Sequence, residues 1–122
     1  VCDAEQEERL RMLPERLSPH HGRYSIHRLL SREAATCFED GSLDFVYIDA
    51  AHAYEAVRED LRLWYPKVRS QGIFAGHDFL DGDRPEGEFG VRRAVLEFER
   101  QKGLRAAVTT EHDWPSWYFI KP

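Results

Sequence analysis

Two short apolar runs that each end in an acidic residue constrain the fold of this chain most strongly. The first expected strand, Leu43 to Ile48, is followed by Asp49, and the second, Gly72 to Gly76, is followed by His77-Asp78. Unbroken apolar runs of this kind are typical of strands that a parallel sheet buries on both faces. Between the two runs, apolar residues recur at helical spacing, namely Ala53, Val57, Leu61, Trp64 and Val68. The pattern therefore predicts a strand–helix–strand unit with carboxylates at the strand ends.

The rest of the chain alternates in the same way between helical and strand patterns. Three elements are expected before the first run: a helix from Asp3 to about Leu17, a strand from Tyr24 to Leu30, and a short helix from Ser31 to Phe38. Four segments are expected after the second run: a mobile, lid-like loop from Asp81 to Gly90, a helix from Val91 to Gly103, and strands from Arg105 to Thr110 and from Trp117 to Ile120. This order predicts an α/β fold with a mostly parallel sheet and an antiparallel C-terminal strand.

Composition excludes several classes of function. The chain has 122 residues, 42% of them apolar, which predicts one domain with a real core. Its net charge of −5 and the lack of a basic stripe argue against a nucleic-acid partner. No apolar run approaches the roughly 20 residues that a membrane span needs. The two cysteines form no CxxC pair, so we expect a soluble protein of the cytoplasm.

The segment from Ser42 to Val57, SLDFVYIDAAHAYEAV, resembles the fourth-strand region of class I S-adenosylmethionine-dependent methyltransferases. The resemblance continues through Asp60-Leu61 and the stretch from Trp64 to Lys67. It then covers GIFAGHDF, residues 72–79, where this family has a fifth strand that ends in GHDY or a close variant. The stretch from Gly90 to Val95 fits the start of the next helix. Several motifs therefore occur in the right order over roughly residues 42–98.

The resemblance implies a Rossmann-like sheet of seven strands, of which this chain holds candidates for strands three to seven. None of its eight glycines forms the glycine-rich turn that holds the methionine part of the cofactor in this family. Residues 1–122 are therefore expected to be a partial methyltransferase domain, truncated at the N-terminus. In the full-length protein it would transfer a methyl group from S-adenosylmethionine to an oxygen of a small-molecule substrate. The alternative is a non-catalytic remnant that serves as an oligomerisation or binding module.

Related metal-dependent O-methyltransferases hold a divalent cation, usually Mg²⁺, with carboxylates at the ends of these two strands. The resemblance thus implies a metal set of Asp49, His77 and Asp78. His77 departs from an all-oxygen set and favours a softer metal or none. The alternative for Asp49 is a cap on the following helix, and for Asp78 a loop turn.

The resemblance also implies a catalytic base, which would be His52 on the first turn of the helix after Asp49. An imidazole can take the proton of an acceptor hydroxyl near neutral pH, and Asp49 would assist at the same site. The alternative is a histidine bonded to Asp49 or to backbone.

Three residues are expected to contact the cofactor: Asp49, Asp3 at the ribose, and Ser31 beside the adenine. For Asp3, the preceding Val1-Cys2 would be the stub of strand two. A helix N-cap is an equally direct explanation of both Asp3 and Ser31.

Two further hypotheses arise from the same segments. Proteins named cephalosporin hydroxylases resemble this family in fold, and His52, His77 and Asp78 could converge on iron as they would in an oxygenase. Without a first strand, the run from Phe45 to Ile48 would have an unpaired edge, which is an association hazard. We expect either the strand from Tyr24 to Leu30 or a second copy of the chain to cover it, the latter as a homodimer.

Overall fold

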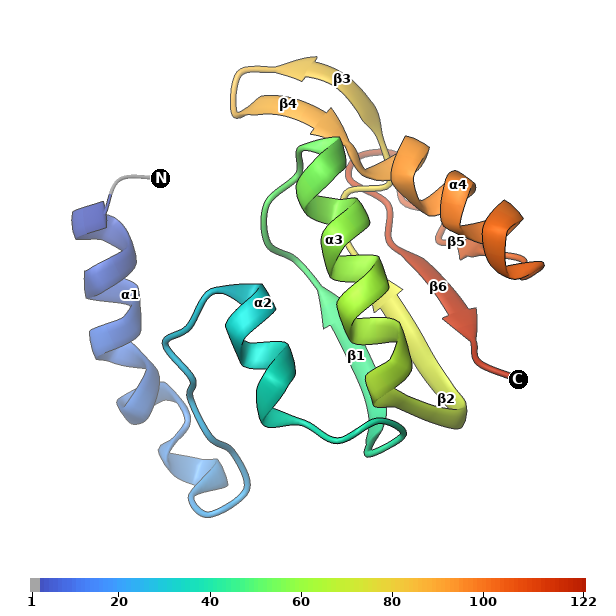
Figure 1. Cartoon of the computed structure of the whole chain (residues 1–122). Coiled ribbons are helices and arrows are strands. Elements are labelled where there is room, and N and C mark those ends of the chain that lie inside the picture. Colours follow the sequence, from blue (N-terminus) through green and yellow to red (C-terminus); the bar gives the residue numbers. More distant parts are fainter. Residues whose placement is uncertain (1–2) are drawn as a thin grey trace.

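The computed structural model describes residues 3–122, and its centre is a four-stranded sheet with the order β1-β2-β6-β5 (Figure 1). The strands are β1 (Leu43–Ile48), β2 (Val68–Gly76), β5 (Ala107–Val108) and β6 (Trp117–Ile120). β1 runs parallel to β2, whereas β6 pairs antiparallel with both β2 and β5. The predicted α/β fold with an antiparallel C-terminal strand is confirmed. The last-but-one strand is much shorter than the predicted range from Arg105 to Thr110.

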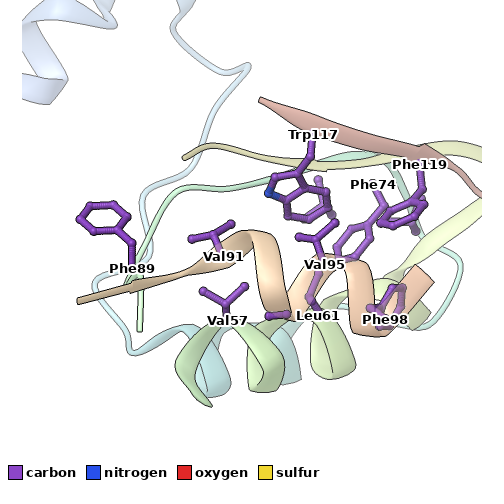
Figure 2. Close-up of a cluster of buried hydrophobic side chains, with 12 residues drawn as sticks. Val57, Leu61, Phe74, Phe89, Val91, Val95, Phe98, Trp117 and Phe119 are labelled. Carbon is purple, nitrogen blue, oxygen red and sulfur yellow. The ribbon is translucent and has the colours of Figure 1, made fainter. Parts of the chain in front are cut away.

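Helices α3 (Tyr54–Trp64) and α4 (Val91–Lys102) cover one face of this sheet (Figure 1). β6 alternates strictly, so that Trp117 and Phe119 face the helices while Tyr118 and Ile120 face away. The core between the two layers is drawn in Figure 2, and its fully buried side chains include Val57, Leu61, Phe74, Val95, Trp117 and Phe119. α4 ends, as predicted, at Gly103, whose φ of 64° suits a glycine C-cap.

The opposite face of the sheet is apolar and exposed. Phe45, Ile73 and Ile120 are in register across β1, β2 and β6, and they are 55, 40 and 59% exposed. β1 is an edge strand, and within residues 3–122 no other strand pairs with its outer side. The prediction that the segment from Tyr24 to Leu30 pairs with this edge is therefore wrong.

The N-terminal part lies to one side of the sheet and consists of helices and coil (Figure 1). The helices are α1 (Asp3–Arg16) and α2 (Ser31–Ala34), with 3-10 turns at Ser18–His20 and Ala35–Cys37. The predicted strand from Tyr24 to Leu30 is an exposed coil. A strand forms only where a neighbouring strand pairs with its backbone N–H and carbonyl groups. Among the described residues, no strand lies in position to pair with this segment. α1 likewise buries no residue.

The segment from Asp81 to Gly90 is an antiparallel hairpin and not the irregular loop that was predicted. Its strands are β3 (Asp81–Arg84) and β4 (Gly87–Gly90). All residues of β3 are exposed, so no apolar alternation marks it in the sequence. The hairpin is joined to α4, because Asp81 Oδ1 accepts a 2.9 Å hydrogen bond from the backbone N–H of Arg93. In the described part of the chain, no helix has the length and apolar character needed to cross a membrane.

Candidate functional site

The candidate site forms where β1 and β2 end side by side. The two strands are parallel, and their last residues, Ile48 and Gly76, are register partners. The backbone N–H of His77 continues the pairing with a 3.0 Å hydrogen bond to the carbonyl of Ile48. The next side chains along both strands must therefore meet at one edge of the sheet, which is where α/β proteins place ligands.

Asp49, His77 and Asp78 each offer a ligand atom, and these atoms all lie within 4.8 Å of one another. His77 Nδ1 is 2.9 Å from Asp78 Oδ1 and 4.0 Å from Asp49 Oδ1. The Asp49 side chain is 55% exposed, whereas that of Asp78 is only 8% exposed. One carboxylate is thus buried and fixed while the other faces solvent, and the predicted meeting of the three side chains is confirmed.

Asp78 holds an uncommon backbone conformation with a φ of 56°. Such a conformation costs on the order of 1–3 kcal/mol for most residues, although aspartate tolerates it better than bulkier side chains. A 2.6 Å hydrogen bond from Leu80 N–H to the carbonyl of Asp78 closes the turn, and Phe79 N–H donates to Pro115 O at 2.8 Å. These bonds aim the carboxylate between two imidazoles, since His52 Nδ1 lies 3.3 Å from Asp78 Oδ2.

His52 lies two residues before α3 and not on its first turn as predicted. The N-cap of α3 is Ala53, and it makes no side-chain capping bond, so the interpretation of Asp49 as the helix cap is wrong. The imidazole of His52 stacks on Phe89 of β4, with 4.5 Å between ring centroids and 6° between ring planes. Its carbonyl also accepts a 2.9 Å bond from Gly90 N–H. The hairpin therefore fixes the position of His52.

Ser31 and Asp3 do not join this cluster. The Ser31 hydroxyl donates to Asp60 Oδ1 at 2.6 Å and accepts from Trp64 Nε1 at 2.8 Å, which ties α2 to α3. The N-cap of α2 is Leu30, so the interpretation of Ser31 as the cap is wrong. Asp3 is exposed in the first turn of α1, and the postulated strand stub Val1-Cys2 lies outside the described residues.

A small cavity of about 10 Å³ lies beneath the cluster. Asp49, His52, His77 and Asp78 line it together with apolar side chains, which include Val57, Val91 and Trp117. This volume holds about one water molecule. The carboxylates and imidazole suit a divalent cation, but the cavity is far too small for the nucleoside of S-adenosylmethionine.

Polar groups next to the cluster continue toward β6. The Tyr47 ring lies 6.3 Å from the His77 ring, and its hydroxyl shares a 2.7 Å hydrogen bond with Ser116 Oγ. The pKa of Glu111 is lowered, chiefly by a hydrogen bond from Thr109 and then by its own backbone amide, with a smaller contribution from nearby His77. A third carboxylate thus adds negative charge near the imidazole of His77.

Sequence reasoning missed two aromatic residues at the site. Phe89 was placed in the predicted loop, although it is the lone aromatic residue of that segment and is 4% exposed. Trp117 was expected only as the first residue of the last strand, and its contact with the cavity depends on the tertiary structure. The one sequence feature that could have indicated a buried role for Phe89 is its position as an aromatic residue in an otherwise polar stretch.

Comparison with known families identifies the class. Residues 1–79 match the model of a family described as "Methyltransferase domain". This match spans more than half of the chain and ends at Phe79, directly after the GHD motif. The chain therefore belongs to that family. S-adenosylmethionine is the cofactor that the family implies. A search of the curated proteins finds no significant match.

Solved structures share the fold at low sequence identity. A protein from Staphylococcus aureus, provisionally described as a caffeoyl-CoA O-methyltransferase, is 16% identical with a TM-score of 0.68, and the alignment covers 91% of this chain and 59% of that one. A protein from Corynebacterium glutamicum is 13% identical with a TM-score of 0.71 and coverages of 98% and 58%. An O-methyltransferase family protein from Burkholderia thailandensis is 17% identical with a TM-score of 0.65 and coverages of 96% and 40%. The chain thus spans 40 to 59% of the length of these proteins.

Proposed function

We propose that this chain carries the cation-binding and acceptor-binding part of an S-adenosylmethionine-dependent methyltransferase that acts on an oxygen of a small molecule. The observation that supports this proposal is the convergence of Asp49, His77 and Asp78 within 4.8 Å at the ends of two parallel strands. Membership of the methyltransferase family and the described O-methyltransferases among the similar structures agree with it.

Asp49, His77 and Asp78 would hold the divalent cation. When bound, such a cation supplies a positive charge that gathers an acceptor hydroxyl and lowers its pKa. Two carboxylates suit Mg²⁺, whereas an imidazole nitrogen shifts the preference toward softer ions such as Mn²⁺. The buried Asp78 would anchor the ion and the exposed Asp49 would face the substrate.

His52 would take the proton from the acceptor hydroxyl. Asp78 Oδ2 lies 3.3 Å from its Nδ1, so a proton on Nδ1 would bond to the carboxylate and leave Nε2 as the acceptor. Stacking on Phe89 holds the ring in this orientation. Asp49 would assist this proton transfer at the same site. The cofactor contacts of Asp3 and Ser31 stay predictions from the family resemblance.

Metal titration of the purified chain tests this proposal. We expect saturable binding of Mn²⁺ and Mg²⁺ by calorimetry, and affinity at least about 10-fold weaker in Asp78→Asn and Asp49→Asn. Asp113→Asn is the matched control, because His112 and Asp113 form an exposed pair at 3.2 Å that belongs to no cluster of three ligands within residues 3–122. Equal affinity in all three variants, or no binding by the unmodified chain, would contradict the proposed cation site.

Titration with S-adenosylhomocysteine separates the enzyme from the alternative. Saturable binding to the chain supports a methyltransferase that reaches its cofactor through these residues. No binding, with the cation site intact, favours either the non-catalytic oligomerisation or binding module or a partial domain that cannot hold the cofactor without a glycine-rich turn.

The homodimer is part of the same proposal. A second copy would pair with the outer edge of β1, where Phe45 and Tyr47 are 55% and 44% exposed. We also propose a cytoplasmic location, which fractionation of the source cells would test.

A further inference from the structure

The indole N–H of Trp117 is a buried donor without an acceptor. Trp117 is 1% exposed, and within residues 3–122 its Nε1 is the one buried side-chain polar atom that has no hydrogen-bond partner. Leaving such a donor unpaired in a core is unfavourable, since the group loses its bond to water on folding. The other core tryptophan, Trp64, does donate, to Ser31 Oγ at 2.8 Å.

Packing by itself does not require a nitrogen at this position. The Trp117 ring contacts Phe74 and Phe119, with centroid distances of 5.6 and 5.9 Å. It also lies directly over Gly76, where a methyl group would overlap its six-membered ring. An aromatic hydrocarbon ring could make these contacts, so the N–H needs a separate explanation.

The residue that carries this unpaired donor also lines the small cavity at the candidate site. Trp117 lines that cavity together with Asp49, His52, His77 and Asp78. Figure 2 shows the indole nitrogen on the side of the ring that faces Val91, which also lines the cavity, and away from Phe74. The cavity measures about 10 Å³, which is the space of one water molecule. Its lining combines four polar side chains with apolar residues and Trp117.

We propose that the indole N–H of Trp117 holds one ordered water molecule in this cavity, and that this water bridges the indole to the carboxylate of Asp78. A buried water needs two to four polar partners, and the cavity supplies a donor from Trp117 and acceptors from the acidic cluster. The volume excludes an acceptor molecule with a carbon skeleton, so water is the oxygen ligand that fits.

The bridging water makes Trp117 a positioning residue of the candidate site. It would restrain the Asp78 carboxylate in addition to His52 and His77, whose Nδ1 atoms lie 3.3 and 2.9 Å from its two oxygens. This role in cation binding rests on the proposed function, whereas the water itself does not. Trp117→Phe is therefore expected to weaken Mn²⁺ binding about 2- to 10-fold, the effect of losing one hydrogen bond.

Proton NMR of the indole groups tests for the water directly. The three tryptophans give three indole N–H signals, which Trp64→Phe and Trp114→Phe assign by elimination. We expect the Trp117 signal to show cross-relaxation with a long-lived water and to broaden first on addition of Mn²⁺. The Trp64 signal is the matched control, because its N–H is already bonded to Ser31.

The outcomes separate this inference from the proposed cation site. A water contact at Trp117 without any response to Mn²⁺ supports the ordered water and overturns the cation site. Mn²⁺ binding without a water contact at Trp117, or with the same affinity in Trp117→Phe as in Trp114→Phe, overturns the inference. Should Trp117→Phe fail to fold, the water contact in the unmodified chain decides.

Discussion

Asp60 and Asp78 are the two charged side chains that the core buries within residues 3–122, and their surroundings differ. Asp78 lies between two imidazoles, whose Nδ1 atoms are 3.3 and 2.9 Å from its two oxygens. Asp60 is 5% exposed and has no cationic partner among its described contacts, only the hydroxyl of Ser31. Burial therefore raises the pKa of Asp60, the hydrogen bond from Ser31 opposes this rise, and the charge of Glu59 adds to it.

The raised pKa predicts how stability depends on pH. The native state holds the Asp60 proton more tightly than the unfolded chain does, so this contribution is present below the ordinary pKa of 3.8 and is lost as the pH rises through the native pKa. Asp60→Asn keeps an acceptor for Ser31 and removes the titration. We expect its stability relative to the unmodified chain to increase from pH 4 to pH 7, as measured by urea unfolding. The control is Asp83→Asn on the exposed strand β3, and the prediction fails if both variants show the same pH dependence.

At the scale of elements, the site depends on contacts between strand ends, hairpin and helix starts. Gly76 is the last residue of β2, and a Cβ there would overlap the Trp117 ring and approach the carbonyl of Ile48 at 2.8 Å. The absence of a side chain at this position lets β1, β2 and β6 close around the cavity.

Gly76→Ala is expected to destabilise the fold by about 1–3 kcal/mol, because the added methyl group overpacks a rigid core. Denaturant unfolding measures the change. Combination with Trp117→Phe should recover part of the loss, since the smaller ring removes the overlapping atoms. Strictly additive losses in the double variant would show that the two residues do not clash.

Asp81 connects the β3–β4 hairpin to α4 through its bond to Arg93 N–H, in the manner of an N-terminal cap. Asp81→Ala should cost about 1 kcal/mol of stability, because the helix loses an acceptor for one of its free N–H groups. Asp83→Ala, on the same strand without such a bond, is the control in the same unfolding assay. A loss of equal size in both variants would contradict the capping role.

At the scale of the whole molecule, the sheet has one covered face and one apolar face that is open. The row of Phe45, Ile73 and Ile120 ends at the outer edge of β1, with which no strand within residues 3–122 pairs. An edge strand with exposed aromatic side chains favours pairing with another strand. Antiparallel pairing of two β1 edges around a two-fold axis would join two four-stranded sheets.

Phe45→Lys should therefore convert the proposed homodimer to a monomer. Sedimentation should give a mass of about twice 14.3 kDa for the unmodified chain and about 14.3 kDa for the variant. Leu30→Lys is the matched control, because Leu30 is also 55% exposed but is the N-cap of α2 and belongs to no strand of the sheet. A monomeric unmodified chain, or an equal effect of both substitutions, would rule out pairing through this edge.

The sequence by itself determined the position of the helices and strands whose apolar residues are buried against one another. α3 and α4 carry apolar residues at helical spacing, and β1 and β2 carry unbroken apolar runs, because these four elements pack on one another. Because parallel neighbouring strands end at the same edge, the meeting of Asp49, His77 and Asp78 also followed from the sequence order. The family motifs lie in this same packed region.

Only the tertiary structure decided the conformation of segments in which burial leaves no periodic pattern of apolar residues. The segment from Tyr24 to Leu30 has the composition of a strand but no strand partner among the described residues, whereas β3 and β4 have a polar composition and pair with each other. Ser31 does not cap α2 and instead donates a hydrogen bond to Asp60, because α3 places Asp60 Oδ1 2.6 Å from the Ser31 hydroxyl oxygen. Phe89 and Trp117 reached the cavity through contacts between elements distant in sequence. Local sequence propensity carries no information about neighbours that are distant in the sequence. For these residues, contacts with such distant neighbours set the conformation.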